Sequence, residues 1–263
     1  MRRPKHSSML NLSGLCQRRI PSYCLVYVLA DFAPERVAQH LSSVRLVADN
    51  REYVSHQGSF RGVSLLTVST GSGASSVATA LEELAFAGAT TFIRIGACGT
   101  TQRRFGLGDF VISTAAVRAE GASSDYAPLG FPALADPQVV SALHQAGKSL
   151  GACCHLGTTY CYATMYPGTG RARPKVHLPL ARWRDEEEFI EAMNSMRIVS
   201  TDMETSIVLL FCSLYNLRGG SICQIVANRS TGVVDLTRSK ERLIDAALEA
   251  MYVLRRSSRS RNC

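Results

Sequence analysis

Short apolar runs rich in β-branched residues alternate along this chain with segments of helical periodicity. The runs that predict strands lie at 24–29, 53–60, 63–69, 91–95, 110–117, 154–162 and 221–227. Segments with one apolar face, which predict helices, lie at 34–41, 75–86, 137–150, 202–215 and 243–255. Because strands that alternate with helices pack as a parallel or mixed sheet covered on both faces, the pattern predicts an α/β fold.

Turn and cap residues support several of these boundaries. Arg61-Gly62 separates two strand-like runs and indicates a hairpin, so part of the sheet is expected to be antiparallel. Asp136 before Pro137 is a favoured pair at a helix start. Residues 167–183 are rich in Gly, Pro and Arg and show no clear period, and a loop of that length is usually functional or disordered.

Length and charge distribution predict a single domain with basic ends. The chain has 263 residues and a hydrophobic content of 46%, typical of one globular core. The net charge is +8, but residues 1–19 and 255–263 together hold nine basic side chains and no acid, so the remainder carries about −1. We therefore expect a flexible extension at 1–22, a domain at 23–254, a disordered tail at 255–263 and no nucleic-acid partner.

Cysteine usage predicts a reducing, cytoplasmic location. The nine cysteines are odd in number and lie mostly in apolar stretches, where Cys behaves as a small buried hydrophobe. No apolar run approaches the roughly 20 residues of a membrane helix, so no membrane partner is expected. Cys153, Cys154 and Cys161 lie near His155, but they lack the spacing of a zinc site, and no metal is expected.

The segment Arg94-Ile-Gly-Ala-Cys-Gly99 follows the apolar run 90–93 and carries the strongest chemical signal. An arginine between isoleucines is costly to desolvate unless its guanidinium finds carboxylate or phosphate oxygens. We expect the strand to end in a turn bracketed by Gly96 and Gly99, at the sheet edge where open α/β sheets bind ligands. A buried ion pair at a strand end explains the same arginine equally well.

Two further segments place polar residues at element ends. In Ser200-Thr-Asp-Met-Glu-Thr-Ser206, Glu204 either forms a capping box with Thr201 or accepts hydrogen bonds from vicinal sugar hydroxyls. Asn228-Arg229 follows the run 221–227. If the strands are parallel, these segments and Arg94 converge on one edge of the sheet.

Taken together, the motifs resemble the nucleoside phosphorylase family and, within it, the uridine phosphorylases. The resemblance runs from about Cys24 to Arg255, and besides the three segments above it rests on Gly108-Asp109, Asp125-Tyr-Ala-Pro128 and Tyr166-Pro-Gly168 with Arg171. It implies a three-layer α/β/α fold with a central mixed, partly barrel-like sheet. It also implies phosphorolysis of an N-glycosidic bond, with inorganic phosphate as co-substrate and no cofactor.

The resemblance also implies roles for individual residues. Arg94 and Glu204 match the catalytic pair. The residues that match phosphate ligands are Arg36, Arg51 and Arg94, of which Arg51 matches an arginine supplied by a neighbouring subunit in a homodimer or a trimer of dimers. The residues that match nucleoside contacts are Met203, Glu204, Arg171, Thr169, Met165 and Arg229. Arg229 follows Asn228 where purine-specific relatives place an aspartate, which favours a pyrimidine substrate.

Several positions depart from the family pattern. The first phosphate loop, a tight Gly-Asp-Pro turn in the family, is longer here and has lost its glycine at 29–36. Ala97 replaces a hydroxyl that contacts phosphate, Thr169 replaces a glutamine that reads uracil, and Met165 replaces a stacking aromatic. Asn11 or Leu12 aligns with a ribose-binding histidine.

These observations leave three functions open. The first is phosphorolysis of pyrimidine nucleosides to free base and (deoxy)ribose 1-phosphate, a pentosyl transfer of pyrimidine salvage. The second is a catalytically impaired homologue that binds nucleoside or acts as a structural or regulatory subunit. The third and weaker one is a nucleoside hydrolase, in which Glu204 or Asp202 would serve as the general base.

Overall fold

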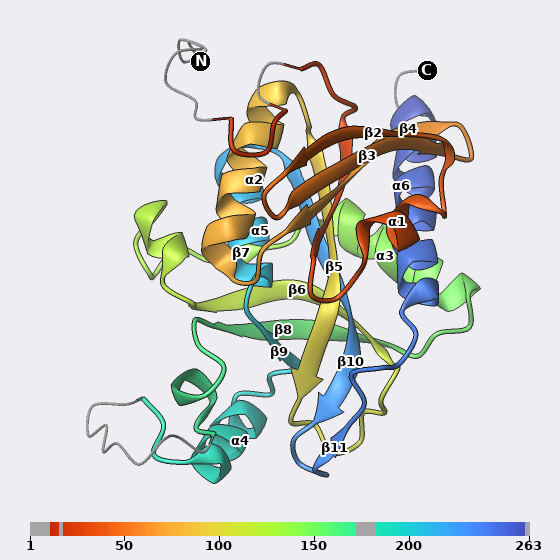
Figure 1. Ribbon diagram of the computed structural model, residues 1–263. Helices are drawn as coiled ribbons and strands as arrows, with labels where there is room; N and C mark the ends of the chain where they lie inside the picture. The colour runs from red at the N-terminus through yellow and green to blue at the C-terminus, as the bar shows by residue number, and fades with distance from the viewer. Residues whose placement is uncertain (1–10, 16–17, 172–181, 261–263) are drawn as a thin grey trace.

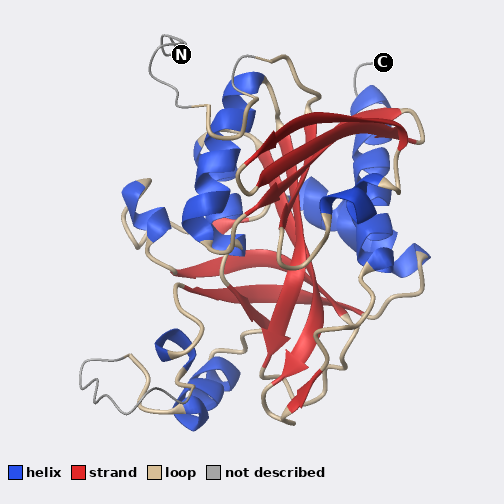
Figure 2. Cartoon of the chain, viewed as in Figure 1, coloured by secondary structure: helices blue, strands red, loops and turns tan. Residues whose placement is uncertain are grey.

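The computed structural model describes residues 11–15, 18–171 and 182–260, which form an eleven-stranded mixed sheet flanked by helices (Figures 1 and 2). The strands are β1 Tyr23–Val28, β2 Ser42–Asn50, β3 Tyr53–Phe60, β4 Val63–Thr70, β5 Thr91–Thr100, β6 Phe110–Ala119, β7 Ala133–Leu134, β8 Cys154–Tyr162, β9 Ser200–Asp202, β10 Arg218–Asn228 and β11 Val233–Val234. The α-helices are α1 Pro34–Ala38, α2 Ala74–Ala87, α3 Pro137–Ser149, α4 Glu186–Ser195, α5 Thr205–Leu214 and α6 Glu241–Ser260. Short 3₁₀ turns lie at η2 Ala122–Asp125 and η3 Pro167–Thr169.

Part of the sheet closes on itself. β5 pairs in parallel with β1 and β10, β10 pairs antiparallel with β6, and β6 continues through β8 and β9 back to β5. These five strands, β5, β10, β6, β8 and β9, form a closed ring. From β1 the sheet extends outward through β4, β3 and β2. The expected mixed, partly barrel-like sheet is therefore confirmed.

Helices cover the sheet on two sides. In Figure 1, α2 and α5 lie side by side on one side and α3 and α6 on the other. The sequence of α6 shows why it packs there: Leu243, Ala247, Met251 and Leu254 recur at helical spacing, and all four are buried against α3 and the strands. Each side thus has its own apolar cluster, with the sheet between them.

Most expected elements are present, and β3 and β8 have the expected bounds. The hairpin at Arg61-Gly62 is also confirmed, with φ of +48° and +80° at the two turn residues. The expected turn at Gly96 and Gly99 is wrong, because β5 continues through both glycines to Thr100. A Cβ on Gly96 would lie 2.7 Å from the Arg94 guanidinium, so this glycine makes room for an arginine side chain.

Five elements were not expected from the pattern: β2, β7, β9, β11 and α4, of which β7 and β11 have two residues each. β2 is almost wholly exposed and lies at the end of the sheet order, so it has no continuous apolar face to mark it. β9 has only three residues. α4 begins at an Asp185 cap and buries Phe189 and Met193, in a stretch where charged residues dominate the sequence.

Both ends of the described chain are more ordered than expected. α6 continues to Ser260, so residues 255–260 are helical rather than disordered. At the other end, Leu15 and Ile20 are buried, and the Glu83 carboxylate accepts the backbone N–H groups of Leu12 and Ser13 at 2.6 Å each. Within the described residues, none of the helices is both long and apolar enough to span a membrane.

Candidate active site

A cavity of about 440 Å³ lies where β1, β5 and β10 end, in the size range of small-molecule sites. β1 and its following loop contribute Val28, Ala30 and Asp31 to the wall. The other lining residues from the sheet, the β8 loop and the start of α5 are Ala97, Cys98, Gly99, Tyr162, Met165, Arg171, Thr201, Asp202, Met203, Glu204, Val226, Ala227 and Arg229. The expected convergence of strand ends on one site is therefore present.

Arg94 lies beneath the cavity floor in a buried ion-pair network. Its side chain is 1% exposed, with Nη1 3.0 Å from Asp202 Oδ2 and Nη2 2.5 Å from Glu204 Oε2. Nη1 also donates to the Cys223 thiol at 2.8 Å, whereas the buried Nε has no hydrogen-bond partner among the described residues. The ion pair foreseen for this arginine exists, and it is made with the same carboxylates that face the cavity.

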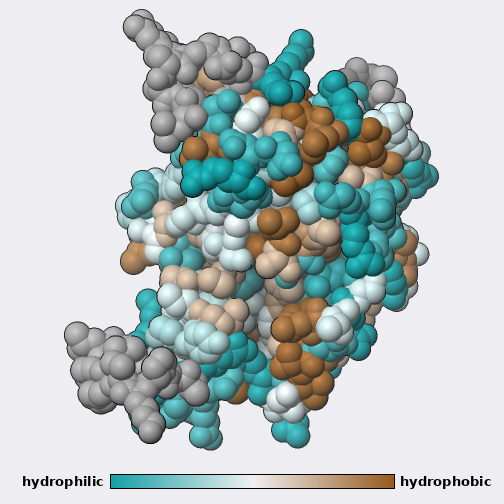
Figure 3. All heavy atoms as spheres, viewed as in Figure 1, coloured by the Kyte–Doolittle hydropathy of each residue, from teal (hydrophilic) through white to brown (hydrophobic). Residues whose placement is uncertain are grey.

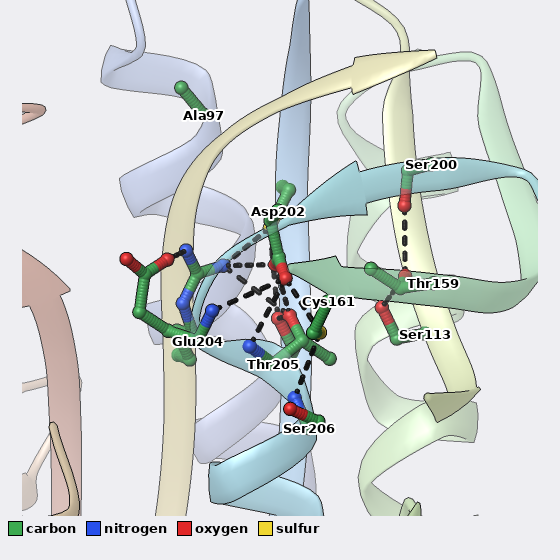
Figure 4. A network of polar contacts seen from close by, with 12 residues as sticks. Ala97, Ser113, Thr159, Cys161, Ser200, Asp202, Glu204, Thr205 and Ser206 are labelled. Carbon is green, nitrogen blue, oxygen red and sulfur yellow. Dashed lines mark hydrogen bonds and ion pairs between the residues drawn. The ribbon is translucent and has the colours of Figure 1, made fainter. Parts of the chain in front are cut away.

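Glu204 is not part of a capping box with Thr201, contrary to that interpretation of the sequence. Thr201 lies in β9, and Asp202 instead accepts the backbone N–H groups of Glu204 and Thr205 at 3.3 and 3.2 Å. The Glu204 side chain accepts from the Gly73 N–H at 2.7 Å with its second oxygen. Figure 4 shows Asp202, Glu204 and Thr205 gathered in this network at the junction of β9 and α5.

Burial and charge act in opposite directions on these groups. Burial raises the pKa of Glu204, and Arg94 only partly offsets that effect. Burial lowers the pKa of Arg94, but Cys223, Asp202 and Glu204 together raise it well above its ordinary value. The guanidinium therefore remains charged, and the floor of the cavity holds one cation between two carboxyl groups.

Two arginines extend the cavity on the side of the β8 loop. Arg229 is held by Glu186, with Nε 2.7 Å from Oε1, and it donates to the Thr169 carbonyl at 2.8 Å. Arg171 donates to the Met165 sulfur at 2.7 Å and keeps 31% of its side chain exposed. Thr169 itself is fully buried and donates its hydroxyl to the Met165 carbonyl, so it supports the loop rather than the cavity wall.

Two of the expected phosphate ligands lie apart from the cavity within one chain. Arg36 is 68% exposed on α1 and pairs with Glu241 at 3.3 Å. Arg51 is exposed at the turn between β2 and β3, with φ of +59°. Neither Arg36 nor Arg51 is among the described residues that line the cavity. The structure thus brings Arg94 to the site but not Arg36 or Arg51.

Asp31 is a lining residue that the sequence reasoning missed. Its Oδ2 accepts the backbone N–H of Ala97 at 2.9 Å, next to the strand end that holds Arg94. If this N–H were free, it would donate to a phosphate oxygen in the cavity. The Asp31 carboxylate therefore occupies a position that a phosphate oxygen would take. The altered loop 29–36 contained the signal, because it places Asp31 three residues after the end of β1.

The sequence reasoning also missed Tyr162 and Glu186. Burial raises the pKa of Tyr162 to about 12, so its phenol is neutral and donates to the Met165 sulfur at 3.6 Å.

The rim of the cavity is apolar: Val234 and Leu236 are 57% and 68% exposed, and hydrophobic surface gathers over this end of the molecule in Figure 3.

Comparison with known proteins agrees with this geometry. The family model of the phosphorylase superfamily matches residues 26–258. A uridine phosphorylase of Thermococcus kodakarensis is 38% identical over 87% of this chain and 82% of its own length. A uridine phosphorylase of Escherichia coli is 35% identical over 74% of this chain and 76% of its own length. A guanosine phosphorylase of Halorubrum lacusprofundi is 30% identical over 75% of this chain and 75% of its own length. With its ringed sheet and its cavity at the strand ends, the chain belongs to the phosphorylase superfamily.

Proposed function

We propose that this protein catalyses phosphorolysis of pyrimidine nucleosides, yielding the free base and (deoxy)ribose 1-phosphate. The observation that carries the proposal is the buried group of Glu204, Arg94 and Asp202 at the floor of a cavity whose far wall presents Arg171 and Arg229. The similarity to proteins named uridine phosphorylases supports the same reaction.

In the proposed complex, Glu204 accepts hydrogen bonds from the ribose hydroxyls and Met203 packs against the sugar. Phosphate attacks the anomeric carbon as the bond to the base breaks, and the bonding electrons leave with the base. Arg171 stabilises the charge that develops on the base carbonyl oxygens. The protein contributes mainly by holding the two reactants in line.

Phosphate in this scheme is held by Arg94 from below and by Arg51 from a neighbouring subunit. Arg36 of the same chain must leave its pair with Glu241 to join them. Guanidinium groups suit this task, since each presents paired donors to phosphate oxygens. Asp31 must share or release the Ala97 N–H when phosphate enters. We therefore expect weaker phosphate binding than in a site with a free N–H.

The choice of base rests on the residues after β10. Asn228 is buried and donates to the carbonyls of Gln102 and Phe105, so it offers no acid to a purine nitrogen. Arg229, held by Glu186, stands next to it as a donor. Uracil can leave with charge on its carbonyl oxygens, which donors stabilise, so uridine is expected to react faster than inosine.

The direct test is to incubate the protein with uridine, thymidine and inosine, each with and without phosphate. Free base and the matching ribose or deoxyribose 1-phosphate should form only with phosphate, and uridine should be the best substrate. No release of base from a folded sample that still binds uridine would place the protein in the impaired, nucleoside-binding class.

One observation favours hydrolysis as the second candidate. Asp31 adds a third carboxylate to the cavity wall, beside the N–H that phosphate would use, where it could activate water. Glu204 and Asp202, the bases considered from sequence, are both engaged with Arg94. Equal release of base with and without phosphate would establish hydrolysis and reject phosphorolysis.

The proposed setting is a cytoplasmic homodimer or trimer of dimers that serves pyrimidine salvage. The seven cysteines that the structure describes are free thiols, which suits a reducing compartment. The exposed Arg51 suits an arrangement in which one subunit completes the phosphate site of its neighbour.

A further inference from the structure

Asp109, Cys153 and His155 bring three different metal-ligand atoms together outside the nucleoside cavity. His155 Nε2 lies 2.8 Å from Asp109 Oδ2 and 3.7 Å from Cys153 Sγ. The three ligand atoms all lie within 4.8 Å of one another. None of these residues lines the nucleoside cavity, so the cluster is a separate feature of the described chain.

The sheet brings these residues together. Asp109 directly precedes β6 and Cys153 directly precedes β8, and the two strands are parallel neighbours in which Val111 pairs with His155. The Phe110 N–H donates to the Cys153 carbonyl at 2.8 Å, which fixes the two strand starts side by side. Residues that are far apart in sequence thus meet at the amino ends of adjacent strands.

Neighbouring contacts orient two of the three side chains. The His155 ring stacks on Phe105 with centroids 3.6 Å apart and an angle of 8° between the planes. The Asp109 carboxylate accepts the Gly106 N–H at 2.9 Å. Partners of this kind hold ligands in place before a metal arrives, and they are typical of metal sites.

Strand alternation explains why only one of the adjacent cysteines joins the cluster. Cys154 points the other way, toward α3, where a Cβ added to Gly147 would lie 2.5 Å from its sulfur. The spacing argument from sequence considered the cysteines and His155 together, and it had no means to include Asp109. Cys154 therefore provides a matched control for Cys153.

We propose that Asp109, Cys153 and His155 bind a zinc ion. A thiolate, an imidazole and a carboxylate are all zinc ligands, and bond lengths of about 2.0–2.3 Å place tetrahedral ligand atoms about 3.3–3.6 Å apart. The contact of 3.7 Å already fits, and the contact of 2.8 Å has to open slightly. Cys153 is exposed, so solvent can supply a water as the fourth ligand.

The bound ion would join the segment before β6 to the segment before β8 and so act as a structural clip. Zinc displaces the Cys153 thiol proton to solvent, so binding should release a proton and weaken as the pH falls. A metal that binds only the folded chain also raises its thermal stability.

Zinc affinity should be measured on untagged protein by competition with a chromophoric chelator, comparing the parent with Cys153→Ala, Asp109→Asn and Cys154→Ala. We expect one zinc per chain in the parent and in Cys154→Ala. Loss of a direct ligand in the other two should weaken binding by more than the roughly 10- to 100-fold typical of outer partners. Because Cys153 is exposed, its removal should leave the fold intact, which circular dichroism would check.

Cobalt substitution supplies a second readout that does not depend on stability. The parent and Cys154→Ala should show a thiolate-to-cobalt charge-transfer band, and Cys153→Ala should not. Zinc should also raise the thermal midpoint of the parent and of Cys154→Ala, but not that of Cys153→Ala. The proposal is overturned if the parent binds no zinc in the competition assay, or if Cys153→Ala binds it as tightly as the parent.

Discussion

At the scale of single residues, Arg94 shows how one side chain serves both stability and the proposed chemistry. It is 1% exposed and lies between Asp202 and Glu204, so its charge is balanced by the fold itself. A buried ion pair contributes little net stability compared with apolar packing, but removal of one partner leaves an uncompensated charge. The loss of Arg94 should therefore affect the whole molecule as well as phosphate binding.

We expect Arg94→Ala to lower the free energy of unfolding by about 3–5 kcal/mol, because two buried carboxylates lose their cation. Urea denaturation would measure the change. Arg36→Ala is the matched control: the Arg36 side chain is 68% exposed, so its pair with Glu241 should contribute at most about 1 kcal/mol. Equal effects of the two variants would show that Arg94 is not the buried partner of these carboxylates.

Glu204 should make nucleoside binding dependent on pH. Burial raises its pKa above the ordinary glutamate value, so it takes up a proton at a higher pH than a free side chain. A protonated carboxyl accepts sugar hydroxyls poorly, and uridine affinity should fall as the pH falls through the raised pKa. Calorimetric titration without phosphate would follow this fall, and Glu204→Gln should show no such step.

The same pKa shift predicts the sign of a stability effect. The folded state holds the Glu204 proton more tightly than the unfolded state does. At low pH, Glu204 therefore makes its full contribution to the free energy of unfolding. That contribution declines as the pH rises from the ordinary to the raised pKa. Comparison of the parent with Glu204→Gln by urea denaturation across this window should show that decline in the parent alone.

At the scale of elements, local pattern predicted the strands and helices that carry a continuous apolar face. β3, β8 and α3 were close to their expected bounds because turns or a cap flank them. β2 and β9 were missed because one is exposed and the other is too short to show a period. For such elements, pairing with neighbouring strands decides the structure.

Much of the candidate site could also be predicted from sequence, but the contacts among its residues could not. Arg94, Glu204 and Arg171 were found by motif and meet at one cavity or directly beneath it. Asp31 was missed because its hydrogen bond to Ala97 joins the loop after β1 to β5, which is distant in sequence. The sequence resemblance gave Thr169 as a nucleoside contact, but in the structure its side chain is buried and bonded to the Met165 carbonyl.

The loop between β1 and α1 should control phosphate affinity through Asp31. At a separation of about 4 Å, like charges repel by about 4 kcal/mol at an effective dielectric constant of about 20. We expect Asp31→Asn to bind phosphate at least about tenfold more tightly, because it removes that repulsion and keeps an oxygen for the Ala97 N–H. Calorimetry with phosphate would measure it. Weaker phosphate binding by this variant would mean that the carboxylate organises the loop instead of competing for the site.

At the scale of the whole molecule, the edge of the sheet offers an interface for the proposed homodimer. β2 ends the strand order, and Val44 and Leu46 on it are 41% and 56% exposed. An exposed edge with apolar side chains is a template for pairing with another chain. Arg51 follows this strand at the turn into β3, so an interface along β2 would carry Arg51 toward a neighbour.

This arrangement is tested by mixing two inactive variants, Arg51→Asn and Glu204→Gln, under conditions that exchange subunits. Asparagine suits the positive φ of +59° at position 51, so the turn is kept while the guanidinium is removed. If Arg51 completes the neighbour's site, a mixed dimer has one site that lacks both groups and one that lacks neither. Random exchange of equal amounts should then restore about a quarter of the parent's activity.

If Arg51 instead acted within its own chain, every site in the mixed dimer would lack one group. Activity would then stay at the level of the separate variants, even after exchange is verified by mass spectrometry of differently labelled chains. Sedimentation of the parent provides the second check, since a fully active monomer leaves no neighbour to supply Arg51. The recovery of activity therefore distinguishes a site shared across an interface, with a twofold axis making both copies equivalent, from a site that one chain completes alone.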